Sequence, residues 1–224
     1  MFSAFFKSIY AIVRLIVHMT VEYMRVVYGV WRLSKLKQPI VTVFGGSKIE
    51  QGHLYAQQAH QLGKMLIEND ISVITGGGPG IMEAANCGAF DNEIDINKAR
   101  TIGIGVKGLE AERRNKCANE FIITKYFFTR KFLLTRYSTA FAVFPGGFGT
   151  LDELFEITTL MQTGHLERFP VVLINTLYWT DLILFIRNAE KEGMLLKKDA
   201  DLIFVTDSLE EAFKHLSQNT KSLQ

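Results

Sequence analysis

The chain has 224 residues and a mass of 25.4 kDa, which is room for one large domain or for a domain with an appendage. Its composition, 48% apolar and 21% charged, supports a packed core and excludes a disordered chain. The 25 basic and 23 acidic residues nearly balance, so the net charge of +2 gives no indication of a nucleic-acid-binding protein.

The first 33 residues form the most apolar stretch of the chain. Charges interrupt it too often for a simple membrane-spanning helix, which needs about 18 to 20 residues with few or no charges. Nor does it clearly show the order of charges, apolar block and small-residue cleavage site that marks a secretory signal. At about 100° per residue, the polar side chains share one narrow stripe of a helix: Lys7, Arg14, His18, Glu22, Arg25 and Arg32.

The rest of this helix surface is apolar over most of the circumference, so the helix must bury more than one face. We expect it to pack against the remainder of the chain and against a second subunit. The alternative is a peripheral helix in a membrane interface, with its cationic side chains reaching toward water. We assign residues 1–37 to this helical extension and residues 38–224 to one domain.

From residue 38 onward, short apolar runs alternate with helical patterns. Strands are expected at 40–44, 71–75, 100–106, 121–124, 140–144, 171–174 and 202–206. Helices are expected at 53–69, 81–90, 127–138, 150–163, 179–193 and 208–217. The alternation predicts an α/β fold, a Rossmann-like doubly wound parallel sheet of about seven strands. Ligands of such sheets bind at the carboxyl ends of the strands.

Three glycine-rich turns follow predicted strands. Residues 45–47 follow the first strand, residues 76–80 the second, and residues 145–150 the fifth. In such a turn, backbone N–H groups can approach an anion, and the dipole of the following helix adds to the attraction. Glycines also make tight turns without any ligand. Two such turns at strand ends, one with three consecutive glycines, nevertheless favour phosphate binding.

Several other kinds of site are disfavoured. Residues 103–108 satisfy the dinucleotide string GxGxxG, but they lie in and after a predicted strand instead of between a strand and a helix. There is no GxxxxGK[ST] string, so a P-loop NTPase is disfavoured. There is no HExxH string and the histidines are scattered singly, so no metal site is expected. Cys87 and Cys117 form no CxxC pair, and we expect a reducing, cytosolic compartment.

Charged residues flank the last glycine turn on both sides. Asp152, Glu153 and Glu156 follow it. Acids there can simply complement the helix dipole, but Glu153 is placed to stabilise a cationic sugar transition state or to take a proton from water. Arg130 and Lys131 precede the turn in an aromatic segment, where a cation needs an anionic partner such as Glu153 or a substrate phosphate.

The string Pro145-Gly146-Gly147-Phe148-Gly149-Thr150-Leu151-Asp152-Glu153 resembles the PGGxGTxxE signature of the LOG (Lonely Guy) family. These enzymes are cytokinin riboside 5′-monophosphate phosphoribohydrolases, long labelled as lysine decarboxylases. Thr129-Arg130-Lys131 resembles the Arg-Lys element of the family, and residues 76–86 resemble its first phosphate turn. Phe128-Thr129 stands where plant members carry Met-His, and this is more similar to the larger bacterial branch.

The resemblance implies a homo-oligomer, a dimer or larger, that needs no cofactor. It implies hydrolysis of the N-glycosidic bond of AMP or of an N6-substituted AMP, giving the free base and ribose 5-phosphate. Arg130 and Glu153 would be the catalytic pair. The substrate-binding residues that we expect are Gly46, Ser47, Gly77, Gly78, Glu83, Lys131, Gly146, Gly147, Gly149 and Thr150.

The alternative function is a non-catalytic carrier of a nucleotide or of the molybdenum cofactor, because molybdenum-cofactor carriers share this fold and similar glycine turns. A carrier has no chemical need for the Arg130–Glu153 pair. A third reading, a membrane-surface scaffold with a vestigial site, is disfavoured by the intact motifs. Decarboxylation with pyridoxal phosphate is also disfavoured, because Lys131 is the only lysine expected near the site and nothing pairs with the pyridinium nitrogen.

Overall fold

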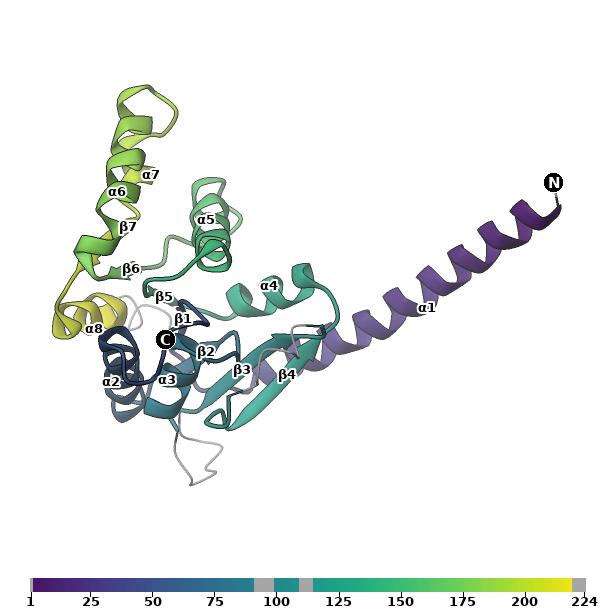
Figure 1. The fold of residues 1–224 in the computed structure, drawn as a ribbon, viewed down its shortest axis with the longest axis horizontal. Coiled ribbons are helices and arrows are strands. Elements are labelled where there is room, and N and C mark those ends of the chain that lie inside the picture. Colours follow the sequence, from purple (N-terminus) through teal and green to yellow (C-terminus); the bar gives the residue numbers. More distant parts are fainter. Residues whose placement is uncertain (1, 91–98, 109–114, 219–224) are drawn as a thin grey trace.

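The structure, a computed structural model, describes residues 2–90, 99–108 and 115–218. Its strands are β1 (Ile40–Phe44), β2 (Ser72–Thr75), β3 (Thr101–Val106), β4 (Glu120–Thr124), β5 (Ala140–Val143), β6 (Val171–Ile174) and β7 (Ile203–Thr206). Its helices are α1 (Phe2–Leu33), α2 (Leu54–Glu68), α3 (Ile81–Gly88), α4 (Phe127–Arg136), α5 (Phe148–Gln162), α6 (Thr176–Lys191), α7 (Lys197–Ala200) and α8 (Leu209–Gln218). Figure 1 shows the sheet with helices on both of its faces.

The strands form one parallel seven-stranded sheet in the order β4-β3-β2-β1-β5-β6-β7. The expected Rossmann-like α/β fold is therefore confirmed. The strand order reverses between β1 and β5, and in open sheets of this kind the crevice at the reversal is the usual ligand site. Phe44 of β1 lies beside Val143 of β5, and Val43 lies beside Thr75 of β2, so the segments that follow these strands meet at one edge.

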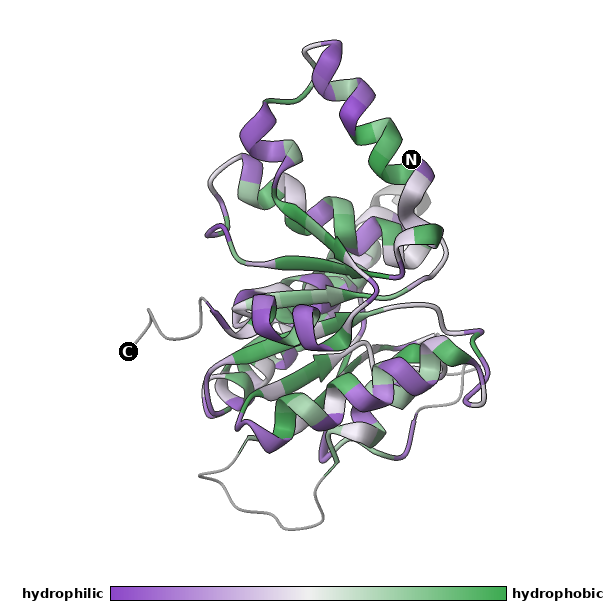
Figure 2. Ribbon diagram, turned by 90° about the vertical axis from the view of Figure 1, so that its left-hand side faces the viewer, coloured by the Kyte–Doolittle hydropathy of each residue, from purple (hydrophilic) through white to green (hydrophobic). Residues whose placement is uncertain are grey.

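The sheet is covered on both faces, which explains why every residue of its central strands β1, β2 and β5 is buried. Val41 and Val43 of β1 face a core shared with α2, α3 and α8. Ile40 and Phe44 of the same strand face the opposite core, shared with α4, α5 and α6. Figure 2 shows the hydrophobic strands enclosed between helices in which hydrophobic and hydrophilic residues alternate.

The structure differs from the sequence expectations mainly at element ends. Helix α6 begins three residues earlier than expected, because Asn175 adopts a positive φ and its side chain accepts a hydrogen bond from the Tyr178 amide. Helix α5 begins at Phe148, inside the glycine turn, two residues earlier than expected. The short helix α7 was not expected, because four residues carry no periodic pattern.

Helix α1 packs on the domain only through its last turns. Glu22 is buried there, and its carboxylate accepts hydrogen bonds from the Lys125 and Tyr126 amides and from the Thr129 hydroxyl. The N-terminal half projects away from the sheet (Figure 1). Packing against the domain is thus partly observed, and packing against a second subunit stays a prediction. Within the described residues, no helix is both long and apolar enough to cross a membrane.

A disulfide joins Cys87 at the end of α3 to Cys117, which precedes β4. The two cysteines are thirty residues apart, and the sequence offered no reason to pair them. Disulfides are characteristic of oxidising compartments, so this bond gives no support to the reducing compartment expected from the sequence. The cytosolic location stays a prediction.

Candidate active site

A cavity of about 670 Å³ opens at the carboxyl ends of β1, β2 and β5, where the strand order reverses. All three glycine turns border it, and so do Arg130 of α4 and Glu153 of α5. The volume lies in the range typical of small-molecule sites. The topology therefore gathers the motifs that the sequence singled out around one space.

The three turns are joined by backbone hydrogen bonds. The Gly46 amide donates to the Pro145 carbonyl at 3.0 Å, and the Ile81 amide donates to the Gly46 carbonyl at 3.1 Å. A side chain at Gly146 would overlap the Thr150 hydroxyl and come within 2.8 Å of the Gly46 nitrogen. Glycine is needed at this position because the first and third turns approach each other so closely.

A network of buried amide groups supports the second turn, residues 76–80, on the side of Asn86 and Asn115. Asn115 donates its backbone amide to the Gly77 carbonyl and its side-chain amide to the Gly78 carbonyl, both at 3.2 Å. The fully buried Asn86 accepts a hydrogen bond from the Thr75 hydroxyl and another from the Asn115 side chain. Every one of these groups is satisfied within the protein, so the backbone of the turn is fixed before any ligand arrives.

Glu153 and Arg130 form an ion pair on the cavity wall, with 3.2 Å between Oε1 and Nη1. Arg130 also donates from Nε to the Ile104 carbonyl at 2.9 Å. A side chain at Gly76 would overlap the guanidinium, so the second turn and Arg130 fit closely. Glu153 is only 5% exposed, and its Oε2 atom is buried without a hydrogen bond from any described residue.

The surroundings of Glu153 make it easy to protonate near neutral pH. Burial raises the pKa of its carboxyl to about 7, against the lowering effect of Arg130 and Lys131, and the neighbouring Glu156 and Asp152 raise it further. A carboxyl with a pKa near 7 can both accept and return a proton at physiological pH. Such a group on a cavity wall is characteristic of an acid–base catalyst.

Ten of the twelve residues expected in the site line the cavity: Arg130, Glu153, Gly46, Ser47, Gly77, Gly78, Gly146, Gly147, Gly149 and Thr150. Glu83 lies in the first turn of α3 and is not part of the wall. Lys131 is not part of it either. Its Nζ atom lies 2.8 Å from Asp152 Oδ2 and 2.8 Å from Glu156 Oε2, so it neutralises the acids that flank Glu153.

The wall also contains side chains that sequence reasoning missed: Lys48, Tyr55, Met82, Phe127, Phe148 and Tyr178. Lys48, not Lys131, is thus a lysine of the cavity, which corrects the sequence expectation. Lys48 follows the first glycine turn directly, two residues after Gly46, and this position could have indicated that it lies at the site. Tyr178 follows β6 at the same edge of the sheet and donates its hydroxyl to the Gly146 carbonyl at 2.6 Å. Among the described residues, no group of three or more His, Cys, Asp or Glu side chains is arranged to hold a metal ion.

The fold is shared with solved structures. The molybdenum cofactor binding protein from Rippkaea orientalis aligns with a TM-score of 0.58 and 22% identity, over 80% of this chain and 94% of that one. The molybdenum cofactor carrier protein from Chlamydomonas reinhardtii aligns with a TM-score of 0.56 and 22% identity, over 82% and 98%. Identity this low shows a common fold and nothing more.

Sequence relatives are more informative. A family model described as "Possible lysine decarboxylase" matches residues 82–216. The cytokinin riboside 5′-monophosphate phosphoribohydrolase LOG3 of Arabidopsis thaliana is 30% identical over 83% of this chain and 85% of its own length. LOG1 of the same plant is 31% identical over 82% and 84%. On these matches, and with residues 145–150, Asp152 and Glu153 of the signature on the cavity wall, the chain belongs to the LOG family of nucleotide ribohydrolases.

Proposed function

We propose that this protein hydrolyses the N-glycosidic bond of a nucleoside 5′-monophosphate, AMP or an N6-substituted AMP, to the free base and ribose 5-phosphate. One observation carries the proposal: a buried carboxyl with a pKa near 7 and an unpartnered oxygen, Glu153, faces a cavity bordered by three glycine turns. The names of the relatives support the class of substrate.

The 5′-phosphate is assigned to the third turn. Gly147 is the N-cap of α5, and Phe148 and Gly149 are its first residues. The first amides of a helix have no acceptor within the helix, and the dipole makes this end attractive to an anion. Lys48 on the same wall adds a positive charge. A phosphate held here directs the ribose toward Glu153, which lies in the second turn of the same helix.

In the proposed reaction, the bond between C1′ and the base nitrogen breaks, and its electron pair goes to the base. The ionised Glu153 stabilises the positive charge that develops on the ribose. Water then forms a bond to C1′ and loses a proton to Glu153. The net reaction moves one proton from water to the base, and a carboxyl with a pKa near 7 can hold that proton in transit. Arg130 fixes Oε1, which leaves Oε2 for the reaction.

A carrier would use the same glycine turns to hold its ligand unchanged. It would gain nothing from Glu153, because burying an ionisable carboxyl without a partner for one oxygen lowers the stability of the fold. We therefore favour the hydrolase.

Full-length protein incubated with AMP, N6-isopentenyl-AMP and adenosine tests the choice, with base and ribose products separated and quantified. We expect equimolar base and ribose 5-phosphate from one or both nucleotides. Adenosine should react far more slowly, because the phosphate contacts contribute binding energy to the reaction at C1′. Tight binding of a nucleotide that stays intact would instead identify a carrier.

A further inference from the structure

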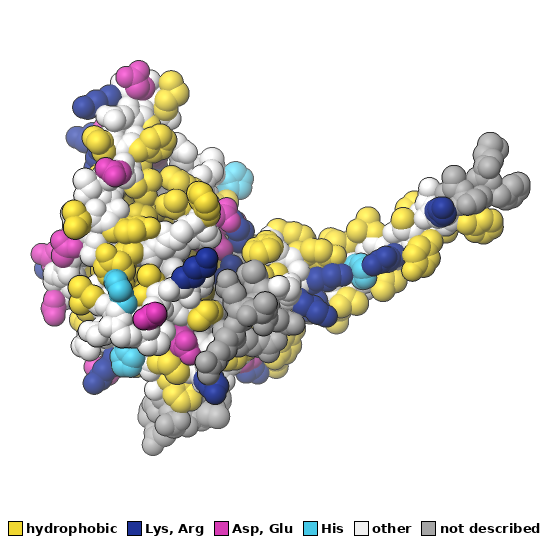
Figure 3. Space-filling view, viewed as in Figure 1, with side chains coloured by type: hydrophobic (Ala, Val, Ile, Leu, Met, Phe, Trp, Pro, Cys, Tyr) yellow, Lys and Arg dark blue, Asp and Glu magenta, His cyan; other side chains and the backbone are white. Residues whose placement is uncertain are grey.

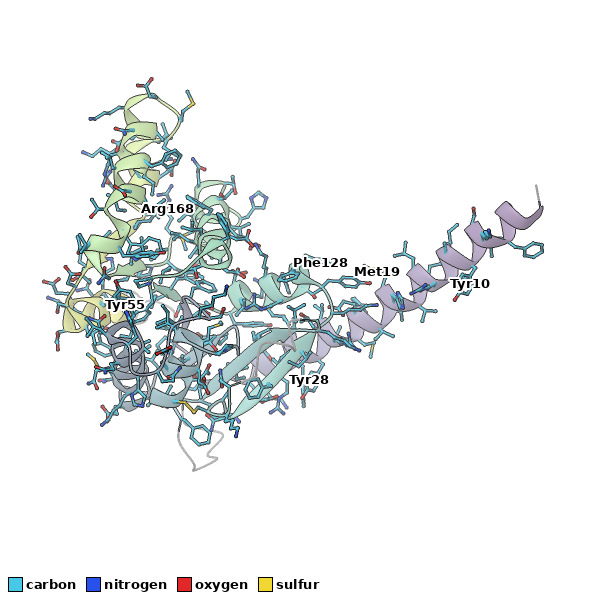
Figure 4. All side chains as sticks on the ribbon, viewed as in Figure 1. Tyr10, Met19, Tyr28, Tyr55, Phe128 and Arg168 are labelled. Atoms are coloured by element: carbon cyan, nitrogen blue, oxygen red, sulfur yellow. A yellow bond between two sulfur atoms is a disulfide. The ribbon has the colours of Figure 1, made fainter. Side chains whose placement is uncertain are left out.

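Helix α1 exposes a long apolar surface that the catalytic domain leaves uncovered. Figure 3 shows hydrophobic side chains along the described part of the projecting helix. Tyr10 is 68% exposed, Met19 44% and Tyr28 49%, and Figure 4 shows them spaced along it. Contiguous apolar surfaces of this extent mark interaction sites on proteins.

Part of the uncovered surface faces away from the side of the helix that contacts the domain. Glu22, Gly29 and Leu33 are buried against the domain, and their spacing of seven and four residues places them on one face. Ile9, Ile16, Tyr23 and Val27, spaced by seven and four residues, define another face, and all four are more than 40% exposed. We call the surface around these four residues the free face.

Positive charge accumulates on the side of the helix opposite the free face, where four basic residues form what we call the cation stripe: Lys7, Arg14, Arg25 and Arg32. Residues 1–37 contain six basic residues and one acidic residue, which leaves 19 basic and 22 acidic residues in the rest of the chain. The appendage is thus strongly cationic, whereas the domain is slightly anionic. Figure 3 shows the basic side chains along one side of the projecting helix.

The domain adds cations where the helix leaves it. His18, Arg25, Lys107 and Lys125 border a small cavity of about 240 Å³ at this junction. Lys125 is the main cause that lowers the pKa of His18, with burial and Arg14 as further causes, so two cations lie close to the His18 ring. Two carboxylates lie between α1 and the domain. Glu22 is engaged by Arg25, by Thr129 and by two backbone amides, and Glu120 of β4 forms an ion pair with Arg32.

We propose that α1 docks this protein on an anionic phospholipid membrane, lying in the plane of the interface. The free face enters the acyl region, and the cation stripe with Lys107 and Lys125 meets the phosphates of the headgroups. At 1.5 Å per residue, the 32-residue helix presents about 48 Å of length to the surface. The domain attaches on the side of Glu22 and Leu33, away from the free face, and therefore stays in water.

A second copy of the chain, the occupant expected from the sequence, is the competing one. Pairing two α1 helices would bury one seam and leave much of the apolar circumference exposed. It would also bring together two helices that each carry four basic residues and one acidic residue, an excess of three positive charges. An anionic membrane complements this charge, so charge complementarity favours the lipid.

The test is co-sedimentation of the full-length protein with two kinds of vesicle, pure phosphatidylcholine and an equal mixture with phosphatidylglycerol. Ile16→Asp and Leu15→Asp are matched variants, because the side chains are 58% and 59% exposed and the charge change is the same. Leu15 is seven residues before Glu22 and shares its face, whereas Ile16 lies on the free face. Thermal melting checks that both variants keep a folded domain.

We expect wild type to bind the anionic vesicles, with binding weakened by high salt. Ile16→Asp should raise the lipid concentration for half-binding about tenfold or more, because it places a charge among the acyl chains, and Leu15→Asp should have a clearly smaller effect. Equal effects of the two variants, or equal binding to both kinds of vesicle, would overturn the proposal. Failure of the wild-type protein to sediment with lipid would also overturn it. If Ile16→Asp then converted a lipid-free oligomer to a monomer, the free face would be an interface between copies of the chain.

Discussion

Replacing Glu153 by Gln should make the protein more stable and inactive at the same time. Gln has nearly the same shape as Glu, and its side-chain oxygen can still accept the hydrogen bond that Arg130 donates at 3.2 Å. It carries no charge, so the substitution removes the energetic cost of burying an ionised carboxyl. It also removes the group that we propose holds the proton during hydrolysis.

The magnitude follows from the pKa. Burial raises the pKa of Glu153 from an ordinary 4.5 to about 7. At 1.36 kcal/mol per pH unit, this difference corresponds to about 3 kcal/mol of unfolding free energy. The folded state binds the proton more tightly than the unfolded state. The contribution to stability is therefore fully present below about pH 4.5 and is lost as the pH rises through about 7.

The assay is denaturant unfolding of wild type and Glu153→Gln at a series of pH values from 4.5 to 8. We expect the variant to gain up to about 3 kcal/mol over wild type as the pH rises across this window. Turnover of nucleotide should fall by about 10²–10⁴-fold. A stability difference that does not change with pH would refute the reasoning, because it would mean that Glu153 titrates as an ordinary carboxyl.

Glu22→Gln is a control in which the stability difference from wild type should depend on pH in the opposite direction. Burial of Glu22 opposes its ionisation, but hydrogen bonds from Thr129 and from the Lys125 and Tyr126 amides outweigh it and lower the pKa. Its stabilising effect is present above its ordinary pKa and is lost as the pH falls through the lower folded value. Glu22→Gln should therefore be less stable than wild type at neutral pH, with a deficit that shrinks in acid.

Three further predictions concern the site and its support. Arg130→Ala should lower turnover by about 10²-fold or more, because Glu153 loses the hydrogen bond that holds its Oε1 atom. Single-turnover kinetics measure the loss, and unchanged turnover would remove Arg130 from the mechanism. Gly146→Ala should lower the unfolding free energy by about 1–3 kcal/mol, because the added methyl group would overlap Thr150. Gly149→Ala is the control, because a methyl group there meets no atom within 4 Å and should not destabilise the fold. Equal losses in the two variants, measured by denaturant unfolding, would contradict this packing. Reducing the Cys87–Cys117 disulfide should lower the unfolding free energy by about 3–4 kcal/mol for a loop of thirty residues, and a free-thiol assay that finds two thiols without reductant would show that the bond does not form.

Much of this structure could be predicted from the sequence, because buried parallel strands and covering helices leave strong periodic patterns. Strand β1 has the bounds expected from the sequence, Ile40–Phe44, because five apolar or β-branched residues end at a glycine turn. The glycine motifs and the resemblance placed Arg130 and Glu153 in one site although 23 residues separate them. The strand and helix patterns and the glycine motifs all indicate the same parallel sheet with a site at its edge, so they were sufficient to predict the fold.

What the sequence left open depends on contacts between distant segments. Tyr178 reaches the site because β6 ends beside β5, and its hydroxyl meets a carbonyl 32 residues away. The Cys87–Cys117 bond depends on how α3 lies against the segment before β4. The pKa of Glu153 depends on burial by the whole fold. None of these features has a local pattern that sequence reasoning could detect.

A crystal structure of Glu153→Gln with AMP tests the central claim most directly. The variant should hold the nucleotide without cleaving it. We expect the 5′-phosphate on the amides of residues 147–149, with C1′ about 3–3.5 Å from the side chain at position 153 or from a water that this side chain binds. A phosphate bound away from the glycine turns, or a ribose whose C1′ faces away from position 153, would contradict the account.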